Sequence, residues 1–84
     1  MTSLEGKDLE IFCKTAKTIF KKGHLNFDAI LRFIGSRNHK QDQKTLEKLY
    51  KLGLIVKHRS DTYELSSIGR MLAMDQCEWF KERH

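Results

Sequence analysis

Residues 45–72 change their hydrophobic period twice, and this constrains the fold more than any other feature of the chain. Leu46 and Leu49 have helical spacing, and Gly53 then lets the chain leave that helix through a left-handed turn. Residues 54–56 and 63–65 are rich in aliphatic and aromatic side chains, as strands are, and the polar run KHRSDT between them is typical of a hairpin tip. Ser66 is a good N-cap for another helix. We therefore predict a helix, a β-hairpin and a second helix.

Residues 4–22 have the pattern of a long first helix. Thr2 or Ser3 can cap its start, and Gly23 follows two lysines at its end. Ile11 and Ile19 fall outside the main apolar stripe, so we expect this helix to have a second apolar face that a partner subunit covers. The main stripe consists of Leu9, Phe12, Cys13, Ala16 and Phe20.

Two further helices are predicted between residues 26 and 53. Asn26 is the expected N-cap of a short helix that Gly35 closes, and residues 24–26 are a short extended link before it. Residues 36–41 are polar and basic and are predicted to form a loop. Asp42 is then the expected cap of the helix that ends at Gly53, with Leu46, Leu49 and Tyr50 pointing inward. The last helix is predicted over residues 67–82, with its buried side formed by Ile68, Leu72, Ala73, Gln76, Trp79 and Phe80.

The length of 84 residues allows one domain, residues 1–84, with a modest core. Cys13 and Cys77 lack the close Cys or His neighbours of a zinc site, and we interpret both as small core residues. A long-range disulfide between them is the alternative, and it would indicate an oxidising compartment or a heat-adapted host. The N-terminus does not resemble a signal peptide, and no apolar run reaches the ~20 residues needed to span a membrane. We expect a soluble, cytoplasmic protein.

The positive charge is concentrated in the middle of the chain. The formal net charge is +5 and the isoelectric point about 9.4. Residues 32–59 contain eight basic and two acidic residues, whereas the rest of the chain has a net charge of −1. Such a distribution favours an acidic partner, and nucleic acid is the common one.

Catalytic and metal-binding patterns are absent from the sequence. The four histidines, His24, His39, His58 and His84, are scattered, and no pair has ligand spacing. No catalytic triad, phosphate-binding loop or paired carboxylates stand out. We therefore predict a protein that is not an enzyme, with no metal, no cofactor and no evident small-molecule ligand.

The order of predicted elements and two motifs resemble the winged helix-turn-helix family, in particular MarR-, PadR- and ArsR-like regulators. The resemblance covers roughly residues 9–72. It implies a mostly helical α+β fold with a three-helix core, a β-hairpin wing and a C-terminal helix. The motifs are Leu46-x-x-Leu49-x-x-x-Gly53-Leu54-Ile55 and Tyr63-x-Leu65-Ser66-x-x-Gly69-Arg70-x-Leu72, and Gly69 is expected to permit close packing.

The chain departs from the usual bacterial pattern in three places. The link at residues 35–41 is longer and more basic, and the third helix begins with residues 42–45 (DQKT) in place of a Ser/Thr-rich turn. The chain also lacks the additional helices that build effector pockets and large dimer interfaces. Its short, proline-free core is similar in style to regulators of archaea and their viruses.

The resemblance implies a DNA-binding surface with three parts. A recognition helix needs long polar side chains near its N-terminal half, and a wing contacts phosphates or the minor groove. The candidates are Gln41, Gln43, Lys44, Thr45 and Lys48 on the recognition helix, Lys57, His58 and Arg59 on the wing, and Arg32, Arg37, His39 and Lys40 as phosphate contacts. Asp61 is expected at the hairpin turn, away from the DNA.

We therefore predict a sequence-specific protein for double-stranded DNA, acting as a transcription regulator. Apolar residues of the first and last helices suggest a homodimer, through Ile11, Ile19, Met71, Met74, Trp79 and Phe80. Two alternatives stay open. One is a winged helix that serves as a protein–protein interaction module in a replication, transcription or sorting complex, and the weaker one is a nonspecific chromatin-type binder.

Overall fold

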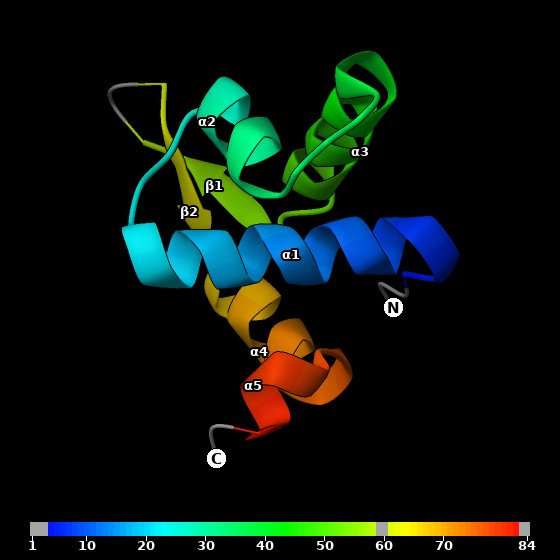
Figure 1. Cartoon of the computed structure of the whole chain (residues 1–84). Helices are drawn as coiled ribbons and strands as arrows, with labels where there is room; N and C mark the ends of the chain where they lie inside the picture. Colours follow the sequence, from blue (N-terminus) through cyan, green and yellow to red (C-terminus); the bar gives the residue numbers. More distant parts are fainter. Residues whose placement is uncertain (1–3, 59–60, 83–84) are drawn as a thin grey trace.

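Helix α1 (Gly6–Lys22) runs through the middle of the molecule, with the other elements on both sides of it (Figure 1). The computed structural model describes residues 4–58 and 61–82, with side chains as far as Phe80. On one side lie α2 (Phe27–Phe33), α3 (His39–Lys51) and a hairpin of β1 (Ile55–Lys57) and β2 (Tyr63–Leu65). On the other lie α4 (Ser67–Gln76) and α5 (Glu78–Glu82). The expected mostly helical α+β fold with one antiparallel hairpin is confirmed.

The central position of α1 explains which of its side chains are buried. The helix contacts α2, α3, β2 and α4, so it is covered on more than one face. Phe12 and Ala16 of the main stripe are fully buried, but Ile11 and Ile19 are buried as well, with 5% of their surface exposed. The prediction that these two isoleucines form a spare apolar face is wrong. Phe20 of the main stripe is the exposed one, at 49%.

Helix α3 begins at His39, earlier than predicted, because Asn38 is its N-cap. The Asn38 side chain accepts a hydrogen bond from the Gln41 amide at 3.2 Å. Asp42 lies one turn inside the helix and is buried, where Oδ2 accepts a hydrogen bond of 2.6 Å from the Ser36 hydroxyl. Asn38 and Asp42 are both good capping residues. The fold uses the first of them and ties the second to the preceding link.

The remaining predictions for α2 and α3 have mixed outcomes. Asn26 caps α2 as expected, accepting from the Ala29 amide at 2.8 Å. Leu46 and Leu49 are fully buried. Tyr50 does not point inward, since 44% of it is exposed and its ring packs edge-on against Tyr63.

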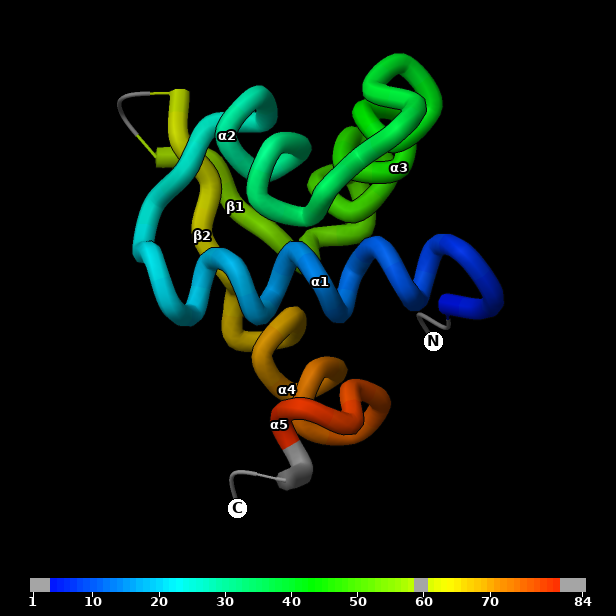
Figure 2. Tube along the Cα trace, in the orientation of Figure 1, coloured from blue at the N-terminus to red at the C-terminus, as the bar shows by residue number. Residues whose placement is uncertain are grey.

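The hairpin follows α3 directly and passes α1 on its way to α4 (Figure 2). Gly53, with φ of +78°, makes the left-handed turn out of α3 as expected. In the hairpin Ile55 pairs with Leu65 and Lys57 with Tyr63. Of the predicted turn residues, Asp61 has a positive φ of 56°, and Ser60 lies outside the described residues.

The extended link before α2 pairs with the hairpin at one isolated β-bridge. Leu25 and Tyr63 exchange two backbone hydrogen bonds, of 2.7 and 3.3 Å, in an antiparallel bridge. Each end of the hairpin is also fixed to helices. Ser66 caps α4 as predicted, accepting from the Gly69 amide at 2.9 Å. Gly69 packs against the backbone of Leu54 so closely that a Cβ there would lie 2.0 Å from the Leu54 carbonyl oxygen.

The last predicted helix is broken into two, α4 and α5, at Cys77. Cys77 has extended backbone angles and forms a disulfide with Cys13 of α1. This outcome decides between the two interpretations of the cysteines in favour of the long-range bond. The Trp79 indole nitrogen donates to the Cys13 carbonyl at 3.0 Å, which holds α5 against the same turn of α1.

The buried side of α4 and α5 agrees with the prediction only in part. Ala73 is fully buried and Phe80 of α5 nearly so, with 5% exposed. Ile68 and Gln76, both predicted to be buried, are exposed.

Candidate nucleic-acid interface

The most outward face of α3 carries three lysines. Lys40, Lys44 and Lys51 are four and seven residues apart, so they lie on one side of the helix. The buried Asp42, which shares the inward side with two leucines, lies opposite. All three lysines are exposed, and no ion pair involves them within the part of the chain that the structure describes. Glu47 is exposed on the same side, three residues after Lys44 and four before Lys51. With three lysines and one glutamate, this face presents a net charge of 3 − 1 = +2 to solvent.

Lys51 belongs to this face although it lies in the last helical turn. A recognition helix is expected to contact bases with its N-terminal half, so the recognition-helix candidates stopped at Lys48. The spacing of the lysines, and not their distance from the helix start, is the signal that groups Lys51 with Lys44.

Lys48 differs from the other lysines of α3 because an acidic side chain of α1 neutralises it. Its Nζ lies 2.7 Å from Asp8 Oδ2. The lysine is about half exposed, so the pair is worth at most about 1 kcal/mol. This contact ties the start of α1 to α3 and lowers the charge that Lys48 offers to a ligand.

The three uncharged candidates on α3 lie on two sides of the lysine stripe. Gln41 belongs to the N-cap, where its amide donates to Asn38. Thr45 is half-buried. Gln43 is exposed. Gln43 is therefore the candidate with the most freedom to form hydrogen bonds with a ligand.

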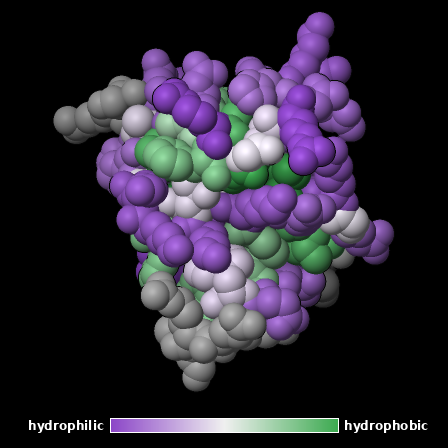
Figure 3. Space-filling model, viewed as in Figure 1, coloured by the Kyte–Doolittle hydropathy of each residue, from purple (hydrophilic) through white to green (hydrophobic). Residues whose placement is uncertain are grey.

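Three of the four predicted phosphate contacts lie on the link that precedes α3 or on its first turn: Arg37 is in the link, and His39 and Lys40 begin α3. Arg32 lies in the last turn of α2. All four are exposed. The structure thus gathers Arg37, His39 and Lys40 at one end of α3, and the hydrophilic side chains that project from the α2 and α3 side are visible in Figure 3.

The hairpin holds its charged residues in local pairs. Lys57 Nζ lies 2.9 Å from Asp61 Oδ1, and this hydrogen bond to the carboxylate raises the pKa of Lys57 above 10.5. His58 Nε2 lies 3.2 Å from Glu64 Oε1. The predicted wing contact Arg59 lies outside the described residues. Asp61 is at the turn as expected, but it also neutralises Lys57.

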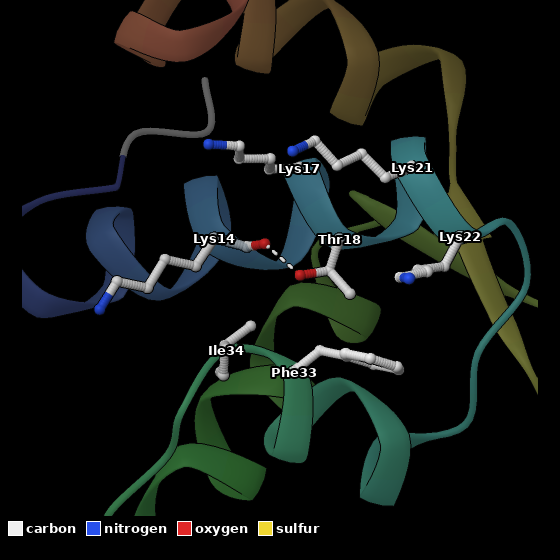
Figure 4. Close-up of a pocket in the computed structure, with 7 residues that line it drawn as sticks. All are labelled: Lys14, Lys17, Thr18, Lys21, Lys22, Phe33 and Ile34. Carbon is white, nitrogen blue, oxygen red and sulfur yellow. Dashed lines mark hydrogen bonds between the residues drawn. The ribbon is translucent and has the colours of Figure 1, made fainter.

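A second basic surface lies on α1 beside α2. The net charge of the sequence around it does not reveal this surface, because acidic residues lie nearby in the chain. A shallow pocket there has Thr18, Phe33 and Ile34 in its wall, with Lys14 and Lys22 extending on either side of Thr18 (Figure 4). The Lys22 ammonium lies 5.2 Å from the centre of the Phe33 ring, a cation–π distance. Lys17 and Lys21 also line this pocket, but their ammonium groups point away from α2.

The predicted dimer residues divide into a buried group and an exposed group. Ile11, Ile19 and Phe80 are buried within the chain, and Trp79 is half-buried, so the first three offer no surface to a partner. Met71 and Met74 are 69% and 51% exposed. Ile68, which is 59% exposed, precedes Met71 by three residues on the same side of α4. We call Ile68, Met71 and Met74 the α4 stripe.

Comparison with known proteins gives no relative: no family model, no curated protein and no solved structure matches this chain. Within residues 4–58 and 61–82, none of the helices has the length and apolar character to cross a bilayer.

Proposed function

We propose that this chain is a winged helix-turn-helix protein that binds double-stranded DNA in a sequence-specific manner and regulates transcription. The observation that carries the proposal is the outward face of α3, where Lys40, Lys44 and Lys51 lie unpaired and opposite the core. Each lysine that neutralises a phosphate releases counterions, and this release supplies much of the affinity for DNA. Gln43, beside the stripe, is the candidate for hydrogen bonds to a base edge, since glutamine pairs with adenine.

The arrangement of the elements supports the winged helix. A three-helix unit of α1, α2 and α3 is followed by a hairpin, and the link at Leu25 pairs with that hairpin through an isolated bridge. Gly53 makes the turn from α3 into β1, and Gly69 lets α4 pack on that turn. Both glycines belong to the motifs on which the resemblance was based. In this proposal α3 is the recognition helix and the hairpin is the wing.

Selection of bound sequences from a random pool of DNA duplexes tests the proposal. A sequence-specific protein enriches a common motif, and the Gln43→Ala variant relaxes the preference at one position of that motif. A Gln76→Ala variant is the matched control, because Gln76 is an exposed glutamine on α4. Retention of duplexes without enrichment would support a nonspecific binder, and no retention at low salt would contradict DNA binding.

The α4 stripe is the basis for the homodimer that we propose as the DNA-binding form. Methionine and isoleucine side chains at three adjacent exposed positions are unusual on a small monomer. A two-fold dimer through α4 would present two copies of α3 to half-sites about 34 Å apart. Sedimentation equilibrium tests this: the wild type should sediment as a dimer and Met71→Lys as a monomer. Phe33→Lys, at a 53% exposed apolar position of α2, is the control and should remain a dimer.

The same stripe favours the second candidate function, a winged helix used as a protein-interaction module. In that case the exposed face of α4 binds another protein, and α3 need not contact DNA. Sedimentation and duplex binding together separate the two functions. If the chain is an interaction module, the wild type and Met71→Lys should both be monomers. Neither should bind duplex DNA at moderate salt.

A further inference from the structure

Two histidines and a glutamate that are distant in the sequence meet on the outer surface of the hairpin. Glu64 of β2 lies between His24, which precedes α2, and His58, which follows β1. Its carboxylate oxygens are 2.9 Å from His24 Nε2 and 3.2 Å from His58 Nε2. The two imidazole rings stack with their centres 4.0 Å apart. We call this group the His–Glu–His cluster.

The backbone register explains why these three side chains share one surface. The antiparallel bridge between Leu25 and Tyr63 places His24 opposite Glu64. In the hairpin Val56 pairs with Glu64. His58, just after β1, lies two residues beyond Val56 and so on the same face, where its amide donates to the Thr62 carbonyl. Glu64 therefore has His24 directly opposite it on one side of β2. On the other side, His58 lies diagonally across from it. Backbone hydrogen bonds therefore place the three residues on one surface.

The donor atoms have the identity and spacing that a divalent transition metal requires. One ligand atom from each residue lies within 4.8 Å of the other two. Bonds of about 2.0–2.1 Å from zinc to imidazole nitrogen or carboxylate oxygen put neighbouring ligands of a tetrahedral site roughly 3.4 Å apart. The two contacts of Glu64 are already near that separation. All three side chains are between 37% and 47% exposed, so the imidazole rings have room to rotate toward a bound ion.

We propose that the His–Glu–His cluster binds one Zn²⁺ ion through His24, His58 and Glu64, with water in the remaining position. Two imidazoles and one carboxylate are a known ligand set for zinc with an open position. The ion replaces the contacts that the two histidines now make with Glu64. It connects the link before α2 to both strands of the hairpin, and so fixes the hairpin to the helical part of the fold. This inference is independent of DNA binding.

The cluster has a positively charged neighbour on α4. Arg70 of α4 lines the same depression as His24 and Glu64, and its positive charge opposes cation binding there. Glu64 supplies the compensating negative charge at shorter range. An Arg70→Gln variant should therefore bind Zn²⁺ at least as tightly as the wild type.

Calorimetric titration of the tag-free protein with ZnCl₂ tests the proposal. We expect one Zn²⁺ per chain, with binding weakened at least tenfold in His24→Ala, His58→Ala and Glu64→Gln. His39→Ala is the matched control, because His39 is an exposed histidine on α3 outside the cluster, and its binding should be unchanged. Absence of binding in the wild type, or equal weakening in His39→Ala, would overturn the proposal.

Two further readouts exclude an indirect effect of the variants. Co²⁺ in place of Zn²⁺ should give visible absorption bands of a nitrogen- and oxygen-ligated site in the wild type and in His39→Ala, but not in His58→Ala. Zn²⁺ should also raise the Tm of the wild type, since an ion that binds the native state stabilises it. Circular dichroism will show whether any of the variants His24→Ala, His58→Ala and Glu64→Gln unfolds without metal. If one does, the titrations of the other two decide. Zn²⁺ binding as tight as in the wild type in either of them would contradict the assignment.

Discussion

The disulfide between Cys13 and Cys77 joins the middle of α1 to the junction of α4 and α5, across 64 positions of sequence. It stands beside the hydrogen bond from Trp79 to the Cys13 carbonyl, so one turn of α1 holds the whole C-terminal part of the fold. A domain of 84 residues buries a small core, and a cross-link over most of its length adds stability that the core cannot supply.

Loss of this disulfide should destabilise the protein substantially. For the variant Cys13→Ala/Cys77→Ala we expect the free energy of unfolding to fall by about 2–4 kcal/mol, because the unfolded chain regains the freedom that the cross-link removes. Guanidinium unfolding followed by circular dichroism measures this. A reducing agent should lower the stability of the wild type to a similar extent and leave the variant unchanged. Two free thiols in the denatured, unreduced wild type would show that the bond does not form.

Replacement of Gly69 by alanine should lower the free energy of unfolding, although the same replacement in a helix usually raises it. Glycine to alanine normally stabilises a helix interior by up to about 1 kcal/mol. Here the added Cβ would lie 2.0 Å from the Leu54 carbonyl oxygen, which belongs to backbone and cannot move aside cheaply. Gly69→Ala should therefore destabilise the protein by about 1–3 kcal/mol in thermal or denaturant unfolding. Ser67→Ala, exposed in the same helix, is the control and should have little effect.

The start of α3 can be tested through its cap. Asn38→Ala removes the acceptor of the Gln41 amide and should cost about 1 kcal/mol of unfolding free energy. Gln43→Ala, at an exposed position of the same helix, should change stability by less than about 0.5 kcal/mol. If α3 instead began after Asp42, Asn38→Ala would be as neutral as the control.

Asp61 should raise the pKa of Lys57 and neutralise its charge on the hairpin. Because Asp61 raises the pKa of Lys57 above 10.5, the pair is intact at neutral pH, and its contribution to stability is lost as the pH rises through that raised pKa. Asp61→Asn keeps a residue that tolerates the positive φ and removes the partner. NMR titration of the Lys57 side chain should then show a lower pKa.

The same variant tests the hairpin as a DNA contact. With Lys57 released, Asp61→Asn should bind duplex DNA more tightly, and its salt dependence should steepen by about one phosphate contact. Asp75→Asn makes the same change of net charge on α4 and should have little effect on the slope. Equal effects of the two variants would show that the hairpin is not at the interface.

The local signals in the sequence predicted the framework of the fold. Asn26 and Ser66 cap the helices that follow them, and Gly53 and Gly69 have the conformations or contacts expected of them. These features depend on a residue and its near neighbours, so spacing and residue type are sufficient to find them. The basic face of α3 could be located for the same reason.

The features that sequence reasoning missed depend on tertiary contacts. Ile11 is buried because α1 is covered on several faces, which a single helical stripe does not predict. The break at Cys77 follows from its bond to Cys13, and the choice of Asn38 over Asp42 as a cap goes with the contact between Asp42 and Ser36. The His–Glu–His cluster is brought together by strand register over 40 positions, so no local spacing of ligands could indicate it.

Contact between the lysine face of α3 and DNA should be measurable in the salt dependence of duplex binding. Fluorescence anisotropy over a series of KCl concentrations should give a slope that falls in magnitude by about two in Lys40→Ala/Lys44→Ala. Lys17→Ala/Lys21→Ala removes the same charge from the side of α1 that points away from α2, and is the matched control. We predict an unchanged slope for the control pair. Equal losses in both pairs, or no duplex binding by the wild type at low salt, would contradict the account.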